Sequence, residues 1–245
     1  MILILRVLFC STMIFFFPVA SVLALQNYSF DGLIEPSEVV KVGSQVSSLL
    51  AEIIVERGDR VKKGQVLARL NSKIERAAVD LALARMEFSK RKVSRNEELY
   101  RKKLISIHDK DEMGTELRIS ELQLREAQEK LEIRTIRSPI NGVVVERFLS
   151  PGEYVGEEAI MKIARINPLY VEVVVPVEVF GKIKKGMRAE VWPEFPGSRK
   201  YSARVIIVDK VIDAASGTFG VRLELPNPDY LLPAGLKCKV VFTVK

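Results

Sequence analysis

The stretch Val55–Leu67, VERGDRVKKGQVL, belongs to a pattern that occurs twice in this chain of 245 residues. The first copy covers residues 43–70, and the second, which contains VERFLSPGEYVGEEAIM, covers residues 137–164. At an offset of 94 residues the matching pairs are Ser48 and Gly142, Gly58 and Gly152, Val61 and Val155, Val66 and Ile160, and Leu67 and Met161. Glycine suits tight turns, and apolar residues between such turns predict short strands around a small β-core. The sequence therefore predicts one β module in two halves, separated by an insert.

The insert, residues 73–134, contains no proline and a single glycine, Gly114. Spacings that alternate between four and three residues predict two helices that pack through heptad seams. The expected seams are Ile74, Ala78, Leu81, Arg85, Phe88, Lys92, Arg95 and Leu99, and then Met113, Leu117, Ser120, Leu124, Ala127, Leu131 and Arg134. The break falls at residues 104–106, where Ser106 can cap the second helix with help from Asp109. Two helices of about 30 residues would form an antiparallel hairpin roughly 45 Å long, which indicates a spacer between other proteins.

The residues after the second half-motif read as a small antiparallel β-barrel. Strand-like runs separated by glycine and proline are typical of such barrels, and they cover residues 170–175, 188–192, 201–208, 218–225 and 237–244. The fold class is thus mixed β with an α-helical hairpin, in which a split β domain is followed by the barrel. We expect the divisions 1–24 signal peptide, 28–72 plus 135–167 split β domain, 73–134 hairpin and 168–245 barrel.

Residues 1–24 have the features of a secretory signal peptide. Arg6 precedes the mostly apolar run 7–19, and small residues allow cleavage after Ala24. A retained membrane anchor is the alternative, but a spanning helix needs about 20 apolar residues and the dense run here is shorter. Cleavage leaves Cys238 as the only cysteine, so no internal disulfide can form. These features predict an exported chain in a bacterial periplasm.

The charge distribution argues against nucleic-acid binding, although the net charge is +7. Residues 73–103 carry ten basic and five acidic residues, whereas residues 107–134 carry five basic and eight acidic ones. A basic helix is therefore expected beside an acidic one. No aromatic residues are interleaved with the basic ones as platforms on which bases could stack.

Three other kinds of site are weighed against the spacer interpretation. Met161-Lys162-Ile163 resembles the lysine tripeptide that is modified in biotin and lipoyl carriers, but those lysines lie between the two half-motifs, where this chain has its insert. A metal site lacks a ligand cluster, since His108 is the only histidine and Cys238 is distant, while Met86 and Met113 fit helix packing. Catalysis lacks a recognisable nucleophile or phosphate loop. We expect a protein that is not an enzyme and holds no cofactor or metal.

The chain resembles the periplasmic adaptor family, also called membrane fusion proteins (HlyD-like), of tripartite efflux and secretion systems. The resemblance covers residues 28 to 245 and is carried by four stretches. These are VGSQVSSLLAEIIVERGDRVKKGQVLARLNS (42–72), SPINGVVVERFLSPGEYV (138–155), VIDAASGTF (211–219) and LELPNPDYLLPAGLKCKV (223–240). Ser48 and Leu49 depart from the Gly-Arg that is usual in the first half-motif. The resemblance implies a split lipoyl-like domain, an α-hairpin and a β-barrel.

The resemblance also implies partners and a docking motif. In this family the hairpin tip meets an outer-membrane channel, while the barrel and lipoyl regions embrace an inner-membrane transporter, with the RND type favoured here. Adaptors of this kind often show an arginine, a leucine four positions later and a serine seven positions further, and Arg95, Leu99 and Ser106 have that spacing. A self-associated ring is expected as well. The expected function is export of small molecules, and the alternative is a scaffold or adaptor for protein or peptide secretion.

Overall fold

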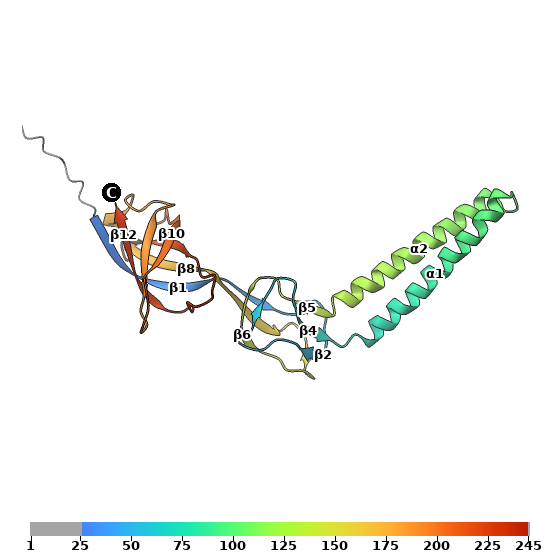
Figure 1. Cartoon of the computed structure of the whole chain (residues 1–245), viewed down its shortest axis with the longest axis horizontal. Helices are drawn as coiled ribbons and strands as arrows, with labels where there is room; N and C mark the ends of the chain where they lie inside the picture. Colours follow the sequence, from blue (N-terminus) through green and yellow to red (C-terminus); the bar gives the residue numbers. More distant parts are fainter. Residues whose placement is uncertain (1–25, 245) are drawn as a thin grey trace, which may run out of the picture.

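The computed structural model describes residues 26–244 as three modules in a row (Figure 1). A β-barrel lies at one end, a β-sandwich in the middle and a helical hairpin at the other end. The expected signal peptide, residues 1–24, lies outside the described residues. Within residues 26–244, no helix combines the length and the apolar character that a membrane crossing requires.

The barrel closes through six strands in the order β1-β12-β9-β10-β11-β8, with β1 pairing back onto β8. Residues on alternate positions of these strands point inward and form one buried apolar core. This confirms the predicted antiparallel barrel. The strands are β1 (Gln26–Val42), β8 (Met161–Pro176), β9 (Arg188–Pro193), β10 (Tyr201–Val208), β11 (Thr218–Leu225) and β12 (Lys237–Val244), and the 3-10 helix η1 (Val177–Val179) follows β8.

The sandwich is built from both half-motifs. One of its sheets has the order β5-β4-β2-β7, and in the other β3 and β6 extend the sheet that β8 and β1 share with the barrel. The matching glycines Gly58 and Gly152 both have positive φ angles, +97° and +93°, as the repeat predicts for equivalent turns. The new strands are β2 (Ser48–Ile53), β3 (Arg60–Val61), β4 (Val66–Leu70), β5 (Thr135–Arg137), β6 (Gly142–Arg147) and β7 (Tyr154–Val155). The predicted split β module is confirmed, since residues from both halves share its core: Val61, Leu67, Val155, Ile160 and Met161.

Two long strands, β1 and β8, run through both the barrel and the sandwich. Gly32 pairs with Val173 in the barrel part, and Val40 pairs with Ile163 in the sandwich part. The sequence-based division groups residues 28–72 with the lipoyl-like half, whereas the first part of β1 pairs with β12 and lines the barrel core. The barrel is therefore assembled from two distant parts of the described chain.

The hairpin consists of α1 (Lys73–Arg101) and α2 (Ile107–Glu132). At the base of the hairpin, the start of α1 and the end of α2 are joined by a largely buried ion pair, in which Arg134 lies 2.6 Å from Glu75. The seam predicted for the second helix is confirmed, because each of its residues is at least partly buried against α1: Met113, Leu117, Ser120, Leu124, Ala127, Leu131 and Arg134.

The seam predicted for the first helix is wrong by one residue. Its apolar members Ile74, Leu81 and Phe88 are 81%, 67% and 53% exposed. The residues that face α2 are instead Glu75, Val79, Ala82, Met86, Ser89, Val93, Asn96 and Tyr100. The physical reason is complementarity with α2, which supplies partners for polar seam residues. Arg134 pairs with Glu75, and the Ser120 hydroxyl lies 3.2 Å from that of Ser89.

Candidate docking surface at the hairpin tip

The turn between the helices is short and held by backbone hydrogen bonds. The amide of Lys103 donates to the carbonyl of Tyr100 at 2.8 Å, and that of Leu104 donates to Leu99 at 2.8 Å. Lys103 adopts a left-handed conformation with φ +58°, which reverses the chain after α1. These bonds present the side chains of residues 102–105 at the end of the hairpin that is farthest from the sandwich (Figure 1).

Ser106 begins α2 as a capping box, as predicted for this position. Its hydroxyl accepts a hydrogen bond from the Asp109 amide at 3.1 Å and donates one to the Asp109 carboxylate at 2.8 Å. The Ser106 amide donates to the same carboxylate at 3.0 Å. These hydrogen bonds, first that of the side chain and then that of the backbone, hold the pKa of Asp109 below its ordinary value of 3.8. The cap rigidifies the turn that carries the exposed residues.

Arg95 and Leu99 occupy the last two turns of α1, and both side chains are exposed. Arg95 forms no ion pair among residues 26–244, so its guanidinium is available to an acceptor. The structure brings Leu99 and Ser106 to the two sides of one turn, with Arg95 one helical turn behind Leu99. All three predicted residues therefore belong to the same end of the hairpin.

Sequence reasoning missed two apolar residues at the tip. Leu104 is 67% exposed and Ile107 is 58% exposed, more than Leu99 at 36%. Between residues 95 and 110 the chain carries five basic and three acidic residues, which surround this apolar group. An exposed apolar group with a cationic border is typical of a protein-binding surface. The signal that could have revealed Leu104 and Ile107 is their position on either side of Ser106, outside both heptad seams.

The residues weighed for other kinds of site lie apart from one another. Lys162 is a half-buried residue at the start of β8, paired with Lys41 on β1 and Glu146 on β6. Cys238 is buried in the barrel, and burial raises the pKa of its thiol to about 11, whereas His108 is exposed at the start of α2. No group of three or more potential metal ligands occurs in the part of the chain that the structure describes.

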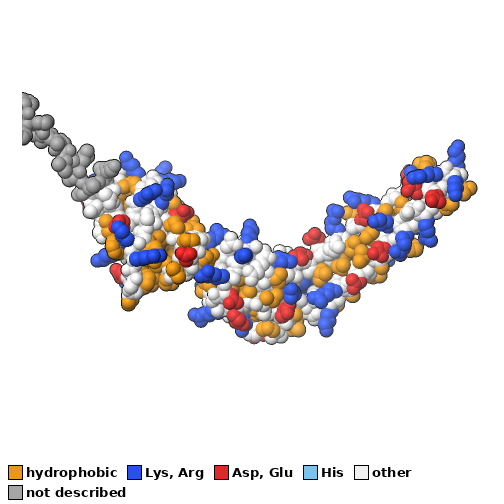
Figure 2. Space-filling view, in the orientation of Figure 1, with side chains coloured by type: hydrophobic (Ala, Val, Ile, Leu, Met, Phe, Trp, Pro, Cys, Tyr) orange, Lys and Arg blue, Asp and Glu red, His pale blue; other side chains and the backbone are white. Residues whose placement is uncertain are grey.

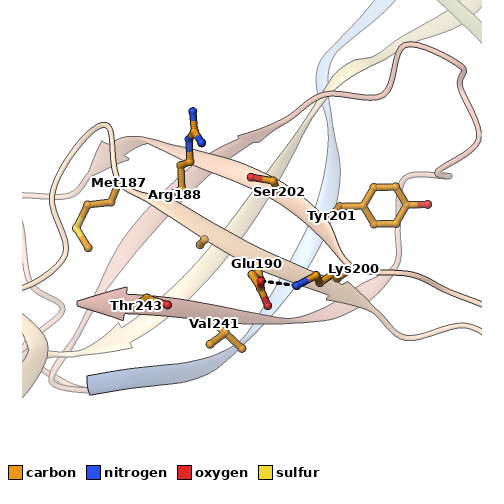
Figure 3. A pocket seen from close by; sticks show the side chains of 9 residues that line it. Met187, Arg188, Glu190, Lys200, Tyr201, Ser202, Val241 and Thr243 are labelled. Carbon is orange, nitrogen blue, oxygen red and sulfur yellow. Dashed lines mark hydrogen bonds and ion pairs between the residues drawn. The ribbon is translucent and has the colours of Figure 1, made fainter. Parts of the chain in front are cut away.

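A shallow hollow of about 550 Å³ lies on the barrel surface over β9, β10 and β12 (Figure 3). Glu190 and Lys200 form an ion pair of 2.8 Å across it, so each neutralises the other. The lining of the hollow consists of Met187, Arg188, Ala189, Glu190, Lys200, Tyr201, Ser202, Val241 and Thr243.

A barrel, a split sandwich and a projecting hairpin in series define a modular, elongated protein with exposed apolar residues at the end of its hairpin. Comparison with known families places the chain more narrowly. Residues 38–165 match the family model described as a CzcB-like, barrel-sandwich hybrid domain, and residues 168–245 match a CusB-like, beta-barrel domain. The chain belongs to the membrane fusion protein family, also called the periplasmic adaptor family, whose members are not enzymes.

Individual relatives agree with this assignment. The chain is 26% identical to the macrolide export protein MacA of Yersinia pestis, over 88% of this chain and 67% of that protein. It is 27% identical to the nodulation protein NolF of Rhizobium meliloti, over 84% of this chain and 60% of that protein. A crystal structure of a MacA-MexA chimera superposes with a TM-score of 0.76 at 22% identity, over 91% of this chain and 82% of the other. The chain spans about 54% to 60% of the first two curated relatives that it matches.

Proposed function

We propose that this protein is a periplasmic adaptor of a tripartite efflux pump, which bridges an inner-membrane transporter to an outer-membrane channel for the export of small molecules. The observation that carries the proposal is the hairpin, which projects from the sandwich at the end opposite the barrel (Figure 1). At its tip Leu99 and Leu104 are exposed near basic residues of the turn. Family membership supports it, since relatives include periplasmic linker proteins of antibiotic and solvent efflux pumps.

The hairpin tip is the surface that we assign to the channel. Leu99 would fill an apolar groove, the free guanidinium of Arg95 would donate hydrogen bonds, and Ser106 would contact backbone while it caps α2. Leu104 and Ile107 add apolar area to the same contact. The capping box limits motion of the turn, which lowers the entropy that docking costs.

We assign the barrel and the sandwich to the transporter, and we favour a transporter of the RND type. The match of the barrel to a CusB-like barrel supports this choice. The adaptor would act as a ring of copies that encloses part of the conduit. Movement at the barrel can reach the sandwich through the continuous strands β1 and β8. A second contact joins the two modules outside these strands. The guanidinium of Arg60, on β3 of the sandwich, lies 4.5 Å from the ring centroid of Tyr230, between β11 and β12, and donates to the Asp229 carbonyl at 3.0 Å.

Substitution of Leu99 tests the proposal. Leu99→Glu places a charge in the apolar docking contact, so we expect normal amounts of folded protein and loss of export, measured as substrate accumulation in cells. Leu83→Glu is the matched control, because Leu83 is exposed to a similar extent, 38%, on the same helix but away from the tip. Normal export by a stably expressed Leu99→Glu variant would contradict the assignment of the tip.

A further inference from the structure

A narrow neck, residues 36–38 of β1 and 165–168 of β8, joins the barrel to the sandwich. On β8, pairing with β11 ends at Leu169 and pairing with β6 begins at Ala164, so between them β8 has only β1 as a neighbouring strand. The register of β1 against β8 is irregular at the same level. In the space-filling view the outline is drawn in between the two modules, with Lys and Arg side chains at this waist (Figure 2). Because a two-stranded ribbon with an irregular register bends more easily than a wider sheet, the angle between the modules depends on what braces the neck.

The loop that follows β11, residues 226–232, is fastened to the neck, and we call it the strap. Asn227 is buried, and its side-chain amide donates hydrogen bonds to the carbonyls of Ile166 at 2.9 Å and Leu232 at 2.8 Å. Its side-chain oxygen accepts from the Leu232 amide at 3.1 Å, and its backbone amide donates to the Asn167 side-chain oxygen at 3.1 Å. A buried amide with all these partners holds a loop in one conformation. The strap is therefore fixed to β8 within the neck.

The strap also fixes the position of Tyr230. This residue has φ +60°, a left-handed conformation that is rare for an aromatic side chain. Its amide donates to the Asn227 carbonyl at 3.1 Å, and Leu232, two residues later, is fully buried in the barrel core. An unfavourable backbone conformation persists only where its surroundings determine it. The Tyr230 ring is therefore held by anchored residues on both sides of it in the sequence.

Arg60, on β3 of the sandwich, reaches the strap from the other module. Its guanidinium lies over the Tyr230 ring and donates to the Asp229 carbonyl. Within residues 26–244, this is the only hydrogen bond, ion pair or cation–π contact between residues 43–160 of the sandwich and residues 169–244 of the barrel. One arginine therefore braces the neck from outside the two continuous strands.

We propose that Arg60, Asp229 and Tyr230 form a latch that sets the angle between the barrel and the sandwich, and that the neck bends when the latch opens. Arg60 is exposed, so the latch can open without disturbance of either core. A cation–π contact combined with a hydrogen bond from a charged group shifts an equilibrium by about tenfold. A latch of that strength can be opened or held by a partner that binds beside it. The latch is a property of the free chain, so it does not depend on the proposed function.

Double electron–electron resonance between two spin labels measures the arrangement of the modules as a distance. In the full chain, the labels are attached at Tyr154→Cys on β7 of the sandwich and Ser202→Cys on β10 of the barrel, both of which are exposed. Cys10→Ser leaves Cys238 as the only native cysteine, and it stays unlabelled because it is buried.

We expect one narrow distance distribution when Arg60 is present. Arg60→Ala should raise the share of molecules outside that distribution by about tenfold. Arg57→Ala is the matched control and should leave the distribution unchanged, because Arg57 is an exposed arginine only three residues away, whereas the contact with the strap belongs to Arg60. Equal unfolding midpoints of the variants show that a change in distance comes from the neck and not from loss of a core.

Tyr230→Ala is a second variant, which should broaden the distribution as Arg60→Ala does. Because the ring and the guanidinium act together, Arg60→Ala/Tyr230→Ala should broaden it no more than Arg60→Ala alone. Three results would overturn the proposal. These are an unchanged distribution in Arg60→Ala, equal broadening by Arg57→Ala, and additive broadening in the double variant.

Discussion

At the scale of single residues, Asp109 makes the stability of the cap at the hairpin tip depend on pH. Its carboxylate accepts hydrogen bonds from the hydroxyl and the amide of Ser106, and these bonds hold its pKa below 3.8. A carboxyl group whose pKa is lowered by folding stabilises the fold above its unfolded pKa, and this contribution is lost as the pH falls through the folded value. The cap at the start of α2 is therefore stronger when Asp109 is ionised.

We expect the cap to weaken as the pH falls below about 3.8, and to be weak at every pH in Asp109→Asn. Amide hydrogen exchange of the first turn of α2 measures this directly. Ser106→Ala should destabilise the same turn by about 1 kcal/mol, the usual cost of removing an N-cap. Protection factors in that turn, which are corrected for the intrinsic pH dependence of exchange, would contradict the assigned cap if they changed neither with pH nor with either substitution.

Substitution of two glycines at different places in the fold is expected to have opposite effects on stability. A Cβ at Gly142 would overlap the carbonyl of Ala164 on β8, whereas a Cβ at Gly114, on α2, has no atom within 4 Å. Gly142→Ala should lower the free energy of unfolding because β6 must move away from β8. Gly114→Ala should raise helix stability by about 0.5–1 kcal/mol, since alanine loses less backbone entropy in a helix.

Urea denaturation followed by circular dichroism measures both glycine variants. The β signal reports on the sandwich and the helical signal reports on the hairpin. Equal effects of the two substitutions, or an unchanged unfolding midpoint for Gly142→Ala, would contradict the close approach of β6 and β8.

At the scale of elements, the sequence pattern predicts the seam of one hairpin helix correctly and that of the other incorrectly. The seam of α2 agrees with its heptad spacing, since Met113, Leu117, Leu124 and Leu131 of the predicted row are the partly buried ones. Helix α1 has two adjacent rows, and the more hydrophobic one, with Ile74, Leu81 and Phe88, faces solvent. The row that faces α2 contains Glu75 and other polar residues, whose partners on α2 a single helix cannot reveal.

For the strands, likewise, the local sequence predicts the sandwich but not a pairing between distant parts of the chain. The repeat predicts the split sandwich because its glycines and apolar residues mark the same turns and core positions in both halves. It does not predict that β1 also closes the barrel, since that pairing joins Tyr28 to Phe242 over most of the chain length. At the tip, spacing locates Arg95, Leu99 and Ser106, but the exposure of Leu104 and Ile107 needs the fold.

The position of the α1 seam is testable by paired substitutions. Val79 faces α2 and Leu81 faces solvent, although the two residues are close neighbours. Val79→Glu should destabilise the hairpin by about 1–3 kcal/mol because it buries an unpaired charge, whereas Leu81→Glu should change hairpin stability by no more than about 0.5 kcal/mol. Thermal unfolding of the hairpin, followed by circular dichroism at low protein concentration, compares them. A larger loss of hairpin stability in Leu81→Glu than in Val79→Glu would contradict the observed seam and favour the one expected from sequence.

At the scale of the whole molecule, the modules lie in series, so the two ends of the protein are separated by the length of the hairpin, the sandwich and the barrel (Figure 1). Strands β1 and β8 join the barrel to the sandwich, and the pair Arg134 and Glu75 fixes the hairpin base. This arrangement suits a protein that contacts one partner at each end and in which movement at one end can reach the other. The channel surface that we propose lies at the tip, where Leu99 and Leu104 are exposed.

Photo-crosslinking from position 99 in intact cells, with the captured protein identified by mass spectrometry, tests the central claim most directly. The account predicts capture of an outer-membrane channel. The same photoreactive residue at position 83, which is exposed on α1 away from the tip, should not capture that channel. Capture of only another copy of this chain from position 99, or of no protein despite normal expression, would contradict the account.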